Sequence, residues 1–488
     1  MDNNDMCLIP MQQIIFCNTR SNYFTRSDTE IIEDREIEGV NSQMEFALSQ
    51  NEHDSMSGLM SLCNIIEEKK GPVVKLLYQK SFFESIICLI NSPSPRVTQN
   101  AIECVFFSFY YGTGDILPLI HSEELFMAII DHLQFSSPGS TIFMICKCIH
   151  MILSKCFSEM TINEINNLLS RLAIVTNEAF HSVPRRSPLL MISCIDDSDN
   201  DSGEMESTGD IETILYSVLS LFGSMIKPFS SFLTEKMLED ISLYFCNALS
   251  LTGMKTLQKT ALNCLGILSE TFINICISAL IQENAIETVI VLTREPDQNK
   301  AEVSLRILHN IMKFEPGLFD FKSVFPSIEK IIISNEFGSN SVTYTVAMDI
   351  LRSISDKDEY SELILNSQLF NNINGRVSQS DFGYKLKSLE FIAAFGSHYW
   401  NNILLEYPNI LLEAINVLNL LEPSANEVFL MQLINIVYRA IELSNNETRN
   451  MIINNIDENH LIEYFGFCSS IEALLYQIGE NRVSNHKT

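Results

Sequence analysis

The segment Cys146-Lys147-Cys148-Ile149-His150 carries the residues best suited to bind a metal. Cysteine thiolates and histidine nitrogens are ligands that zinc prefers. On a helix Cys146 and His150 share a face, whereas Cys148 points elsewhere. Zinc sites more often pair cysteines as C-x2-C or take their ligands from loops. We therefore interpret the segment as a buried helix with reduced cysteines, and expect no bound metal and no cofactor.

The acidic stretch 184–210 contains aspartates at every second position from Asp197, as a calcium loop does. A calcium-binding helix-loop-helix needs Gly at the sixth loop position and Glu at the twelfth. Counted from Asp197, those positions hold Ser202 and Thr208. The stretch fails this test, and we interpret it as a flexible insert.

The same insert contains two serines that are candidates for regulatory phosphorylation. Ser187 lies in Arg-Arg-Ser-Pro, and Ser198 has an acidic residue three positions on. A phosphate adds about two negative charges to this already acidic segment. One hypothesis is that modification changes whether the insert covers a binding surface; the alternative is a solvated, unmodified excursion.

Motifs that signal catalysis are missing from the chain. It has no Gly-rich phosphate loop, no GxSxG and no HExxH. Its histidines are dispersed, and an isolated one such as His121 or His398 is more often structural than catalytic. We expect a protein that is not an enzyme.

Length and charge narrow the class of partner. The chain has 488 residues, of which 46% are hydrophobic, enough for a continuous core over several domains or one repetitive array. With 32 basic and 61 acidic residues its net charge is -29. Nucleic acids and anionic membranes are bound through Lys and Arg, so neither is an expected partner.

We expect neither membrane insertion nor a secretion signal. Its start, Met1 to Asp5, is acidic, and the apolar stretches 141–157 and 272–292 are interrupted by charges such as Lys147 and Glu283. We expect a cytoplasmic protein, with a nuclear location as the alternative. Cysteines spread through apolar segments are expected to be reduced and buried: Cys63, Cys88, Cys104, Cys246, Cys264 and Cys276.

A triplet of apolar or small residues at offsets 0, +4 and +7 recurs along the chain. On a helix such a triplet lies on one face. The first copy is Ala101, Val105 and Ser108, which follows a proline break at Ser92–Pro95. Further copies begin at Ile145, Ser217, Ala261, Ser304, Ala347, Ser388 and Leu433, and one more is placed at Ser57 by counting back 44 residues from Ala101. Neighbouring copies are 41 to 45 residues apart, except where the insert intervenes.

This periodicity predicts an all-α array of repeats, each too small to bury its apolar face alone. The pattern resembles the armadillo/HEAT-type helical repeat family, most closely at Leu308-His309-Asn310-Ile311 and from Ser92 to Ala101. The resemblance implies a right-handed α-solenoid of about nine repeats, in which the last helix of each repeat lines a concave groove for extended peptides.

The domain organisation follows from the repeat positions. We predict an acidic, partly disordered segment 1–55, a first block of repeats 56–183, the flexible insert 184–210, and a second block 211–488.

Residues at offsets +2, +5, +6 and +9 of each triplet helix are expected to face the groove. In the first copy they are Glu103, Phe106, Phe107 and Tyr110. Other candidates for partner binding are Phe222, Arg306, Asn310, Arg352 and Asn435. The groove would be apolar toward the N-terminus and charged toward the C-terminus, and an apolar groove suits an amphipathic helix. The alternative is that the aromatic side chains only pack against a neighbouring helix.

Importin-alpha adaptors are the obvious proteins of this kind to compare. The residues of this chain disfavour a role as a nuclear-import adaptor. Those proteins carry a ladder of Trp and Asn and a basic N-terminus. Here Asn310 matches the asparagine position, but Ile267 and Ser353 occupy it in the adjacent copies, and the single tryptophan, Trp400, lies past the end of such a helix.

The predicted function is therefore a scaffold or adaptor that acts as a monomer and binds a peptide or helical segment of another protein. A regulatory subunit or chaperone cofactor that clasps a folded domain is the alternative.

Overall fold

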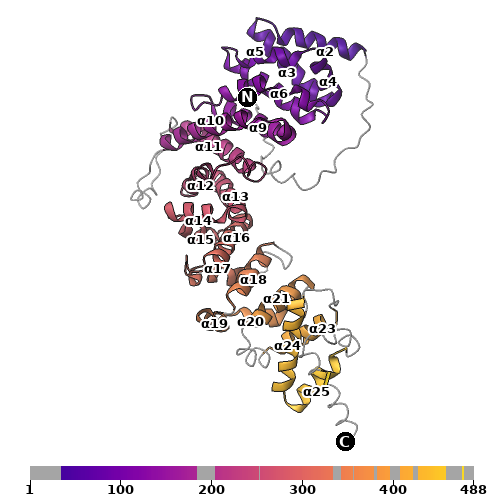
Figure 1. The fold of residues 1–488 in the computed structure, drawn as a ribbon, viewed down its shortest axis with the longest axis vertical. Coiled ribbons are helices and arrows are strands. Elements are labelled where there is room, and N and C mark those ends of the chain that lie inside the picture. The colour runs from indigo at the N-terminus through magenta and orange to yellow at the C-terminus, as the bar shows by residue number, and fades with distance from the viewer. Residues whose placement is uncertain are drawn as a thin grey trace. The chain divides into compact units, whose positions relative to one another are not determined.

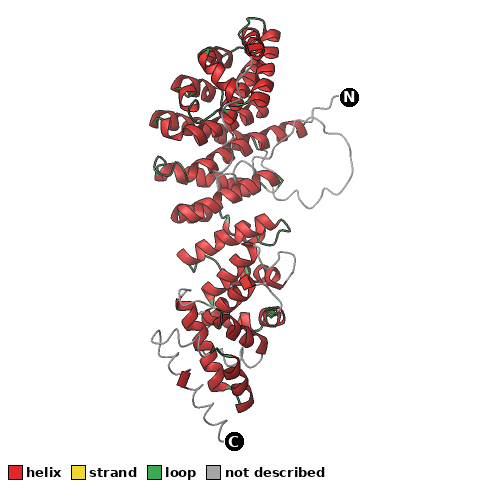
Figure 2. Cartoon of the chain, turned by 90° about the vertical axis from the view of Figure 1, so that its right-hand side faces the viewer, coloured by secondary structure: helices red, strands yellow, loops and turns green. Residues whose placement is uncertain are grey.

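The computed structural model describes residues 34–183, 204–251, 253–333, 342–355, 357–378, 382–395, 407–420, 427–457 and 475–476. Within these ranges the regular structure is entirely helical, with 23 α-helices and two 3-10 helices and no strand (Figure 2). The all-α prediction is confirmed. The chain divides into two compact units, Met1–Ile267 and Leu268–Thr488.

The first unit contains two rows of helices in which each member contacts the next (Figure 1). One row, called the inner row here, is α3 (Glu52–Lys69), α6 (Pro95–Tyr111), α9 (Gly139–Cys156) and α11 (Glu204–Ile226). The other is α5 (Phe82–Ile90), α8 (Glu123–Asp131) and α10 (Ile162–Ser182). The remaining helices are α2 (Asp34–Ala47), α4 (Gly71–Gln79), α7 (Leu117–Ile120), α12 (Glu235–Leu249) and α13 (Lys255–Thr271), whose last turn belongs to the second unit; η2 (Phe157–Glu159) follows α9.

The second unit repeats this arrangement. Its inner row is α16 (Gln298–Phe314), α18 (Val342–Ile354), α21 (Phe382–Ala394) and α24 (Glu427–Leu443). A second row consists of α17 (Phe325–Ile333), α20 (Leu369–Arg376), α23 (Pro408–Leu418) and α25 (Asn446–Asn455). The other elements are α14 (Ile273–Gln282), α15 (Ile286–Leu292), η4 (Phe321–Ser323) and α19 (Asp358–Leu365).

Local sequence signals set where these helices begin. Ser94 is the N-cap of α6, where its hydroxyl accepts a hydrogen bond from the Val97 amide, and Pro95 follows at the first position. Thr161 and Glu164 form a reciprocal capping box at the start of α10. Glu164 also meets His121, whose Nε2 lies 3.2 Å from Oε1 of this buried carboxylate. His121, which precedes α8, thus contacts the start of α10.

The predicted core register is confirmed in seven helices. Every member of the triplets beginning at Ala101, Ile145, Ala261, Ser304, Ala347, Ser388 and Leu433 is buried, and so are Ser217 and Leu221. Ser224 is half-buried. Small residues such as Ala and Ser at the first position let the next helix of the row approach closely, which explains their recurrence.

At the N-terminus the register and the start of the array differ from the prediction. Ser57 is exposed, and the buried triplet of α3 is Leu59, Cys63 and Ile66. Repeat length varies with the turns between helices, so counting back a fixed interval misses by two positions. The array also begins before residue 56, because α2 packs on α3: the Ser55 hydroxyl donates to the Ala47 carbonyl at 2.7 Å.

The insert is shorter than predicted, because α11 begins at Glu204 rather than after residue 210. Asp210 accepts a hydrogen bond from the Gly139 amide at 2.7 Å and so caps the start of α9. Ser187 and Ser198 lie outside the described residues, as do Asp197 and His398.

Within the part of the chain that the structure describes, one helix, Gly139–Glu159, is long and apolar enough to cross a membrane, and Ile273–Gln282 with Ile286–Leu292 would pass the same test if the 100° bend between them is ignored. In the first unit α9 packs between α6 and α11, and its apolar side chains are largely buried. A core helix of a soluble array has the same composition, so the feature is weak evidence for a membrane span.

Candidate partner-binding surface

Four aromatic side chains lie together on the outward face of α6, and we call them the aromatic stripe: Phe106, Phe107, Tyr110 and Tyr111. The opposite face of α6 holds its core triplet, so the helical period places these residues away from the core. Phe106, Phe107 and Tyr111 are half-buried, and Tyr110 is 47% exposed. Phe106, Phe107 and Tyr110 therefore lie on the side of α6 away from its core triplet, the side that their offsets predict.

The rings of the stripe contact one another. Phe107 and Tyr111 stack with centroids 6.1 Å apart, and Tyr110 meets Tyr111 edge-on at 4.8 Å. Phe106 lies 5.3 Å from Phe107 and 5.9 Å from Tyr110. Such contacts hold large side chains in fixed orientations, so a partner would meet a preorganised apolar surface.

Below the stripe, cysteines join α3 to α6. The interaction of the Cys63 thiol with that of Cys104, together with burial, raises the pKa of Cys63. Both cysteines are buried and free of disulfide bonds. The buried, reduced state predicted for the cysteines holds for these two and for Cys246, Cys264 and Cys276, but Cys88 is exposed on α5.

Glu103 and Lys147 place opposite charges on adjacent helices, α6 and α9. Burial raises the pKa of Glu103, and the charge of Lys147 partly offsets this. Burial also lowers the pKa of Lys147, with Glu103 acting in the opposite direction. The Lys147 ammonium lies 4.4 Å from the centroid of the Phe143 ring, a cation–π contact on the same helix.

Glu67, on the last turns of α3, contributes negative charge at the other side of the stripe. The pKa of Tyr111 is raised by burial and, in addition, by the carboxylate of Glu67. Glu67 is exposed, and no described basic side chain forms an ion pair with it. The neighbouring Lys69 is held by Glu36 at 2.8 Å.

The cysteine-rich segment of α9 is part of the core. Cys146 and Cys148 are fully buried, and burial raises the pKa of both thiols. His150 also has a pKa lowered by burial. Among the residues that the structure describes, no three His, Cys, Asp or Glu side chains come close enough to hold a metal ion.

In the second unit, three predicted partner-binding residues of the inner row are bonded to neighbouring helices. Arg306 pairs with Glu270 of α13 at 3.2 Å and also contacts Glu302. Asn310 donates to the Ser269 hydroxyl at 3.0 Å. The side-chain amide of Asn310 therefore already has a partner within the chain. A bound peptide backbone would have to displace the Ser269 hydroxyl to reach it.

The same pairing continues along α18 and α21. Arg352 lies 3.5 Å from Glu390. Lys387 lies 3.2 Å from Asp349 and 3.0 Å from Glu390. These groups and Arg306 with its partners are called the charge ladder below. Each charge of the ladder is satisfied by a residue 3 to 38 positions away in the chain.

Two further predicted residues have different surroundings. Asn435 on α24 is half-buried. Phe222 is only 2% exposed, so the prediction that it faces an open groove is wrong. Its ring stacks on Tyr244 of α12 at 6.1 Å, and Tyr244 also stacks on Phe180 of α10 at 6.2 Å. Helix α12 therefore covers the outward face of α11 around Phe222, whereas the corresponding face of α6 carries the aromatic stripe.

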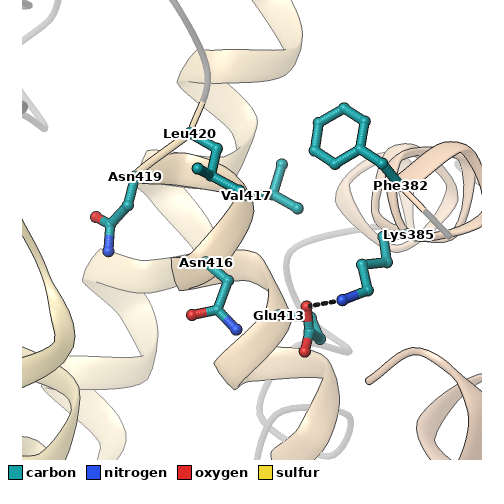
Figure 3. Close-up of a pocket in the computed structure, with 7 residues that line it drawn as sticks. All are labelled: Phe382, Lys385, Glu413, Asn416, Val417, Asn419 and Leu420. Atoms are coloured by element: carbon teal, nitrogen blue, oxygen red, sulfur yellow. Dashed lines mark ion pairs between the residues drawn. The ribbon is translucent and has the colours of Figure 1, made fainter. Parts of the chain in front are cut away.

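The second unit also contains an open hollow of about 390 Å³ between α21 and α23 (Figure 3). Its apolar lining includes Phe382 and Leu420, which are 47% and 69% exposed. At its base the Lys385 ammonium pairs with the largely buried Glu413 carboxylate at 2.9 Å. The repeat pattern did not predict the hollow, because it forms between two helices from different rows.

The sequence analysis also did not include three residues among its candidates for partner binding: Tyr111, Glu67 and Lys147. Tyr111 falls one position beyond the outward offsets used, although its aromatic type next to Tyr110 was a usable signal. Glu67 and Lys147 belong to other helices: the charge of Glu67 acts on Tyr111 and that of Lys147 acts on Glu103, which depends on how α3, α6 and α9 pack.

No family model matches the chain, and no curated protein matches it. Among solved structures, the crystal structure of an engineered protein, a target of the Northeast Structural Genomics Consortium, is similar over 91% of this chain and 98% of its own, with a TM-score of 0.57 and 14% identity. A second engineered protein of that consortium matches 56% of this chain and 97% of its own, with a TM-score of 0.38 and 15% identity. At these identities the first likeness concerns the fold alone, and the second is too low to carry an argument.

Proposed function

We propose that this protein is a non-enzymatic scaffold or adaptor that binds a peptide or helical segment of another protein. In this proposal the chain is a right-handed α-solenoid of about nine armadillo/HEAT-like repeats, and the inner rows line its concave face. It acts as a monomer in the cytoplasm, or in the nucleus.

The observation that carries the proposal is the aromatic stripe on α6. Four adjoining aromatic side chains on one outward helix face are unusual at a surface that stays in water, and such patches are typical of protein interaction sites. Aromatic residues also supply much of the binding energy at protein interfaces. The charge ladder offers no comparable surface, because its charged groups already satisfy one another.

A helical segment suits the geometry of the stripe. Phe106, Phe107, Tyr110 and Tyr111 occupy offsets 0, +1, +4 and +5, so they cover between one and two turns of α6. An amphipathic helix presents apolar residues at i, i+3 and i+4, which match a surface of this length.

Selection of ligands on the purified full-length chain tests the proposal. Random peptides of about 16 residues would be displayed, selected for binding, and then synthesised and titrated by fluorescence anisotropy. The Phe106→Ala/Phe107→Ala/Tyr110→Ala variant should lose at least about tenfold in affinity for the selected peptides, since removing buried anchors costs more than 1 kcal/mol each at a binding site.

Tyr78→Ala provides the matched control. Tyr78 is an exposed aromatic residue on α4, outside both rows, and its removal should leave affinity unchanged. Circular dichroism of both variants would verify that the helices remain folded. Selected peptides that bind the triple variant as tightly as the natural chain would refute the stripe as the binding surface.

A further inference from the structure

We infer that the chain's own N-terminal segment 6–17 covers the aromatic stripe, and that a partner displaces this segment when it binds. This inference rests on the proposed function and adds a form of regulation to the same surface. Three observations carry it: the apolar stripe itself, an apolar segment in the same chain, and a tether long enough to bring the two together.

The segment 6–17 has the composition of an occupant for an aromatic surface. It contains no charged residue, although 19% of the chain is charged. Met11, Ile14 and Ile15 have offsets 0, +3 and +4, which place them on one face of a helix. Pro10 suits the first turn of such a helix. The segment lies outside the described residues, and its sequence pattern is that of an amphipathic helix that binds an apolar surface.

The charges around the stripe favour an uncharged occupant. On the α3 side, Glu67 and Lys70 are both exposed and carry opposite charges. Glu103 of α6 and Lys147 of α9 are both half-buried, and they also have opposite signs. A strongly charged segment of either sign would meet a like charge here, and like charges at an interface cost affinity. The segment 6–17 avoids this cost.

The tether between the segment and the folded unit is long enough to reach the stripe. Helix α2 begins at Asp34 and packs on α3, which packs on α6. Packed helices lie about 8–10 Å apart, and a helix of this length extends for about 20 Å, so the start of α2 lies within about 40 Å of the stripe. The extended chain 18–33 spans up to about 50 Å.

Tethering makes even a weak contact effective. A segment on a short flexible linker has an effective concentration of about 1 mM at a surface within its reach. With an intrinsic Kd of about 0.1 mM, the segment would cover the stripe about 90% of the time, and the apparent affinity of a partner would fall about tenfold. Covering of this kind keeps the aromatic side chains from non-specific contacts until a tighter partner arrives.

Charges introduced into the segment test the inference in the full-length chain. Met11→Asp/Ile14→Asp/Ile15→Asp should release the stripe, because three carboxylates cannot be buried against aromatic rings without partners. Stripe-dependent peptides, selected as described above, should therefore bind this variant about tenfold more tightly than the natural chain in fluorescence anisotropy. A gain in affinity cannot result from a loss of folding.

The matched control adds the same three charges at polar positions of the tether. Asn18→Asp/Ser21→Asp/Ser27→Asp should leave the affinity within about twofold of that of the natural chain, since it keeps the apolar segment intact. The segment can also be supplied separately. A synthetic peptide of residues 5–20 should bind the variant with the charged segment, and it should lose at least about tenfold in affinity when the triple alanine change in the stripe is added.

The outcomes separate this inference from the proposed function. Selected peptides that require the stripe but bind the natural chain and the variant with the charged segment equally tightly would overturn the covering segment and leave the binding surface in place. A synthetic peptide 5–20 that binds independently of the stripe would also overturn it. Selected peptides whose affinity is independent of the stripe would remove both.

Discussion

The inner row of the first unit and that of the second have the same core but different outward faces. Ala101 of α6 and Ala347 of α18 both begin a fully buried triplet. On the outward side, α6 presents the aromatic stripe, whereas α16, α18 and α21 form the charge ladder. The comparison shows that an outward side chain is available to a partner only when no residue of the neighbouring helices already pairs with it or covers it.

Core substitutions should have the largest effect and should be equal in the two units. Ala101→Asp and Ala347→Asp each place a carboxylate at a position that is 0% exposed and has no basic partner in its triplet. Each should lower the stability of its unit by about 3–5 kcal/mol, measured by urea unfolding with circular dichroism. Ser57→Asp, at an exposed position of α3, is the control. A mild effect in one unit alone would show that its register is wrong.

Outward substitutions should distinguish the units in binding. Phe107→Ala should weaken a stripe-dependent peptide about tenfold, because it removes a large ring from the contact surface. Arg352→Ala should leave the same affinity within about twofold, since its partner is Glu390 of the same unit. Fluorescence anisotropy with one labelled peptide would compare the two variants directly. A larger loss for Arg352→Ala would move the binding surface to the charge ladder.

Acidification should weaken the second unit through His309. This side chain is 7% exposed on α16, and burial, aided by Lys313 and opposed by Asp349, lowers its pKa to about 4. The unfolded chain then binds the proton more readily, so stability is fully present above about pH 6.5 and falls as the pH decreases toward 4.

Urea unfolding at pH 7.5 and pH 5.0 would measure this contribution. His309→Gln should reduce the difference in unfolding free energy between the two pH values by about 1 kcal/mol, after allowance for partial contact with water. An unchanged difference in the variant would mean that His309 is equally easy to protonate in the folded and unfolded chain.

The smallest effect is expected for a single pair of the charge ladder. Lys387→Ala should cost about 0.5 kcal/mol, because Lys387 and Asp349 are partly exposed and water competes for their charges. A double-mutant cycle with Asp349→Ala, in low salt and again in 0.5 M salt, would isolate the pair. Coupling that persists in high salt would show a contact better shielded from water than its exposure indicates.

The sequence predicted the core register well, because a helix repeats every 3.6 residues and a buried face must stay apolar or small. It also predicted the outward direction of Phe106, Phe107 and Tyr110. The same rule failed at Phe222, which has the matching offset on α11 but is covered by Tyr244 of α12. Offsets report the direction of a side chain along its own helix and carry no information about what packs against it.

The chain's own amino-acid pattern thus determined the all-helical repeat, its core positions and the helix starts at Ser94 and Thr161, since these depend on residues close in sequence. Tertiary structure decided which outward residues stay available. Arg306 is paired because Glu270 of α13 lies 3.2 Å away, and the charge of Glu67 acts on Tyr111 because α3 packs beside α6. Contacts across some 36 to 44 residues depend on the packing of whole helices, and helical periodicity alone cannot specify it.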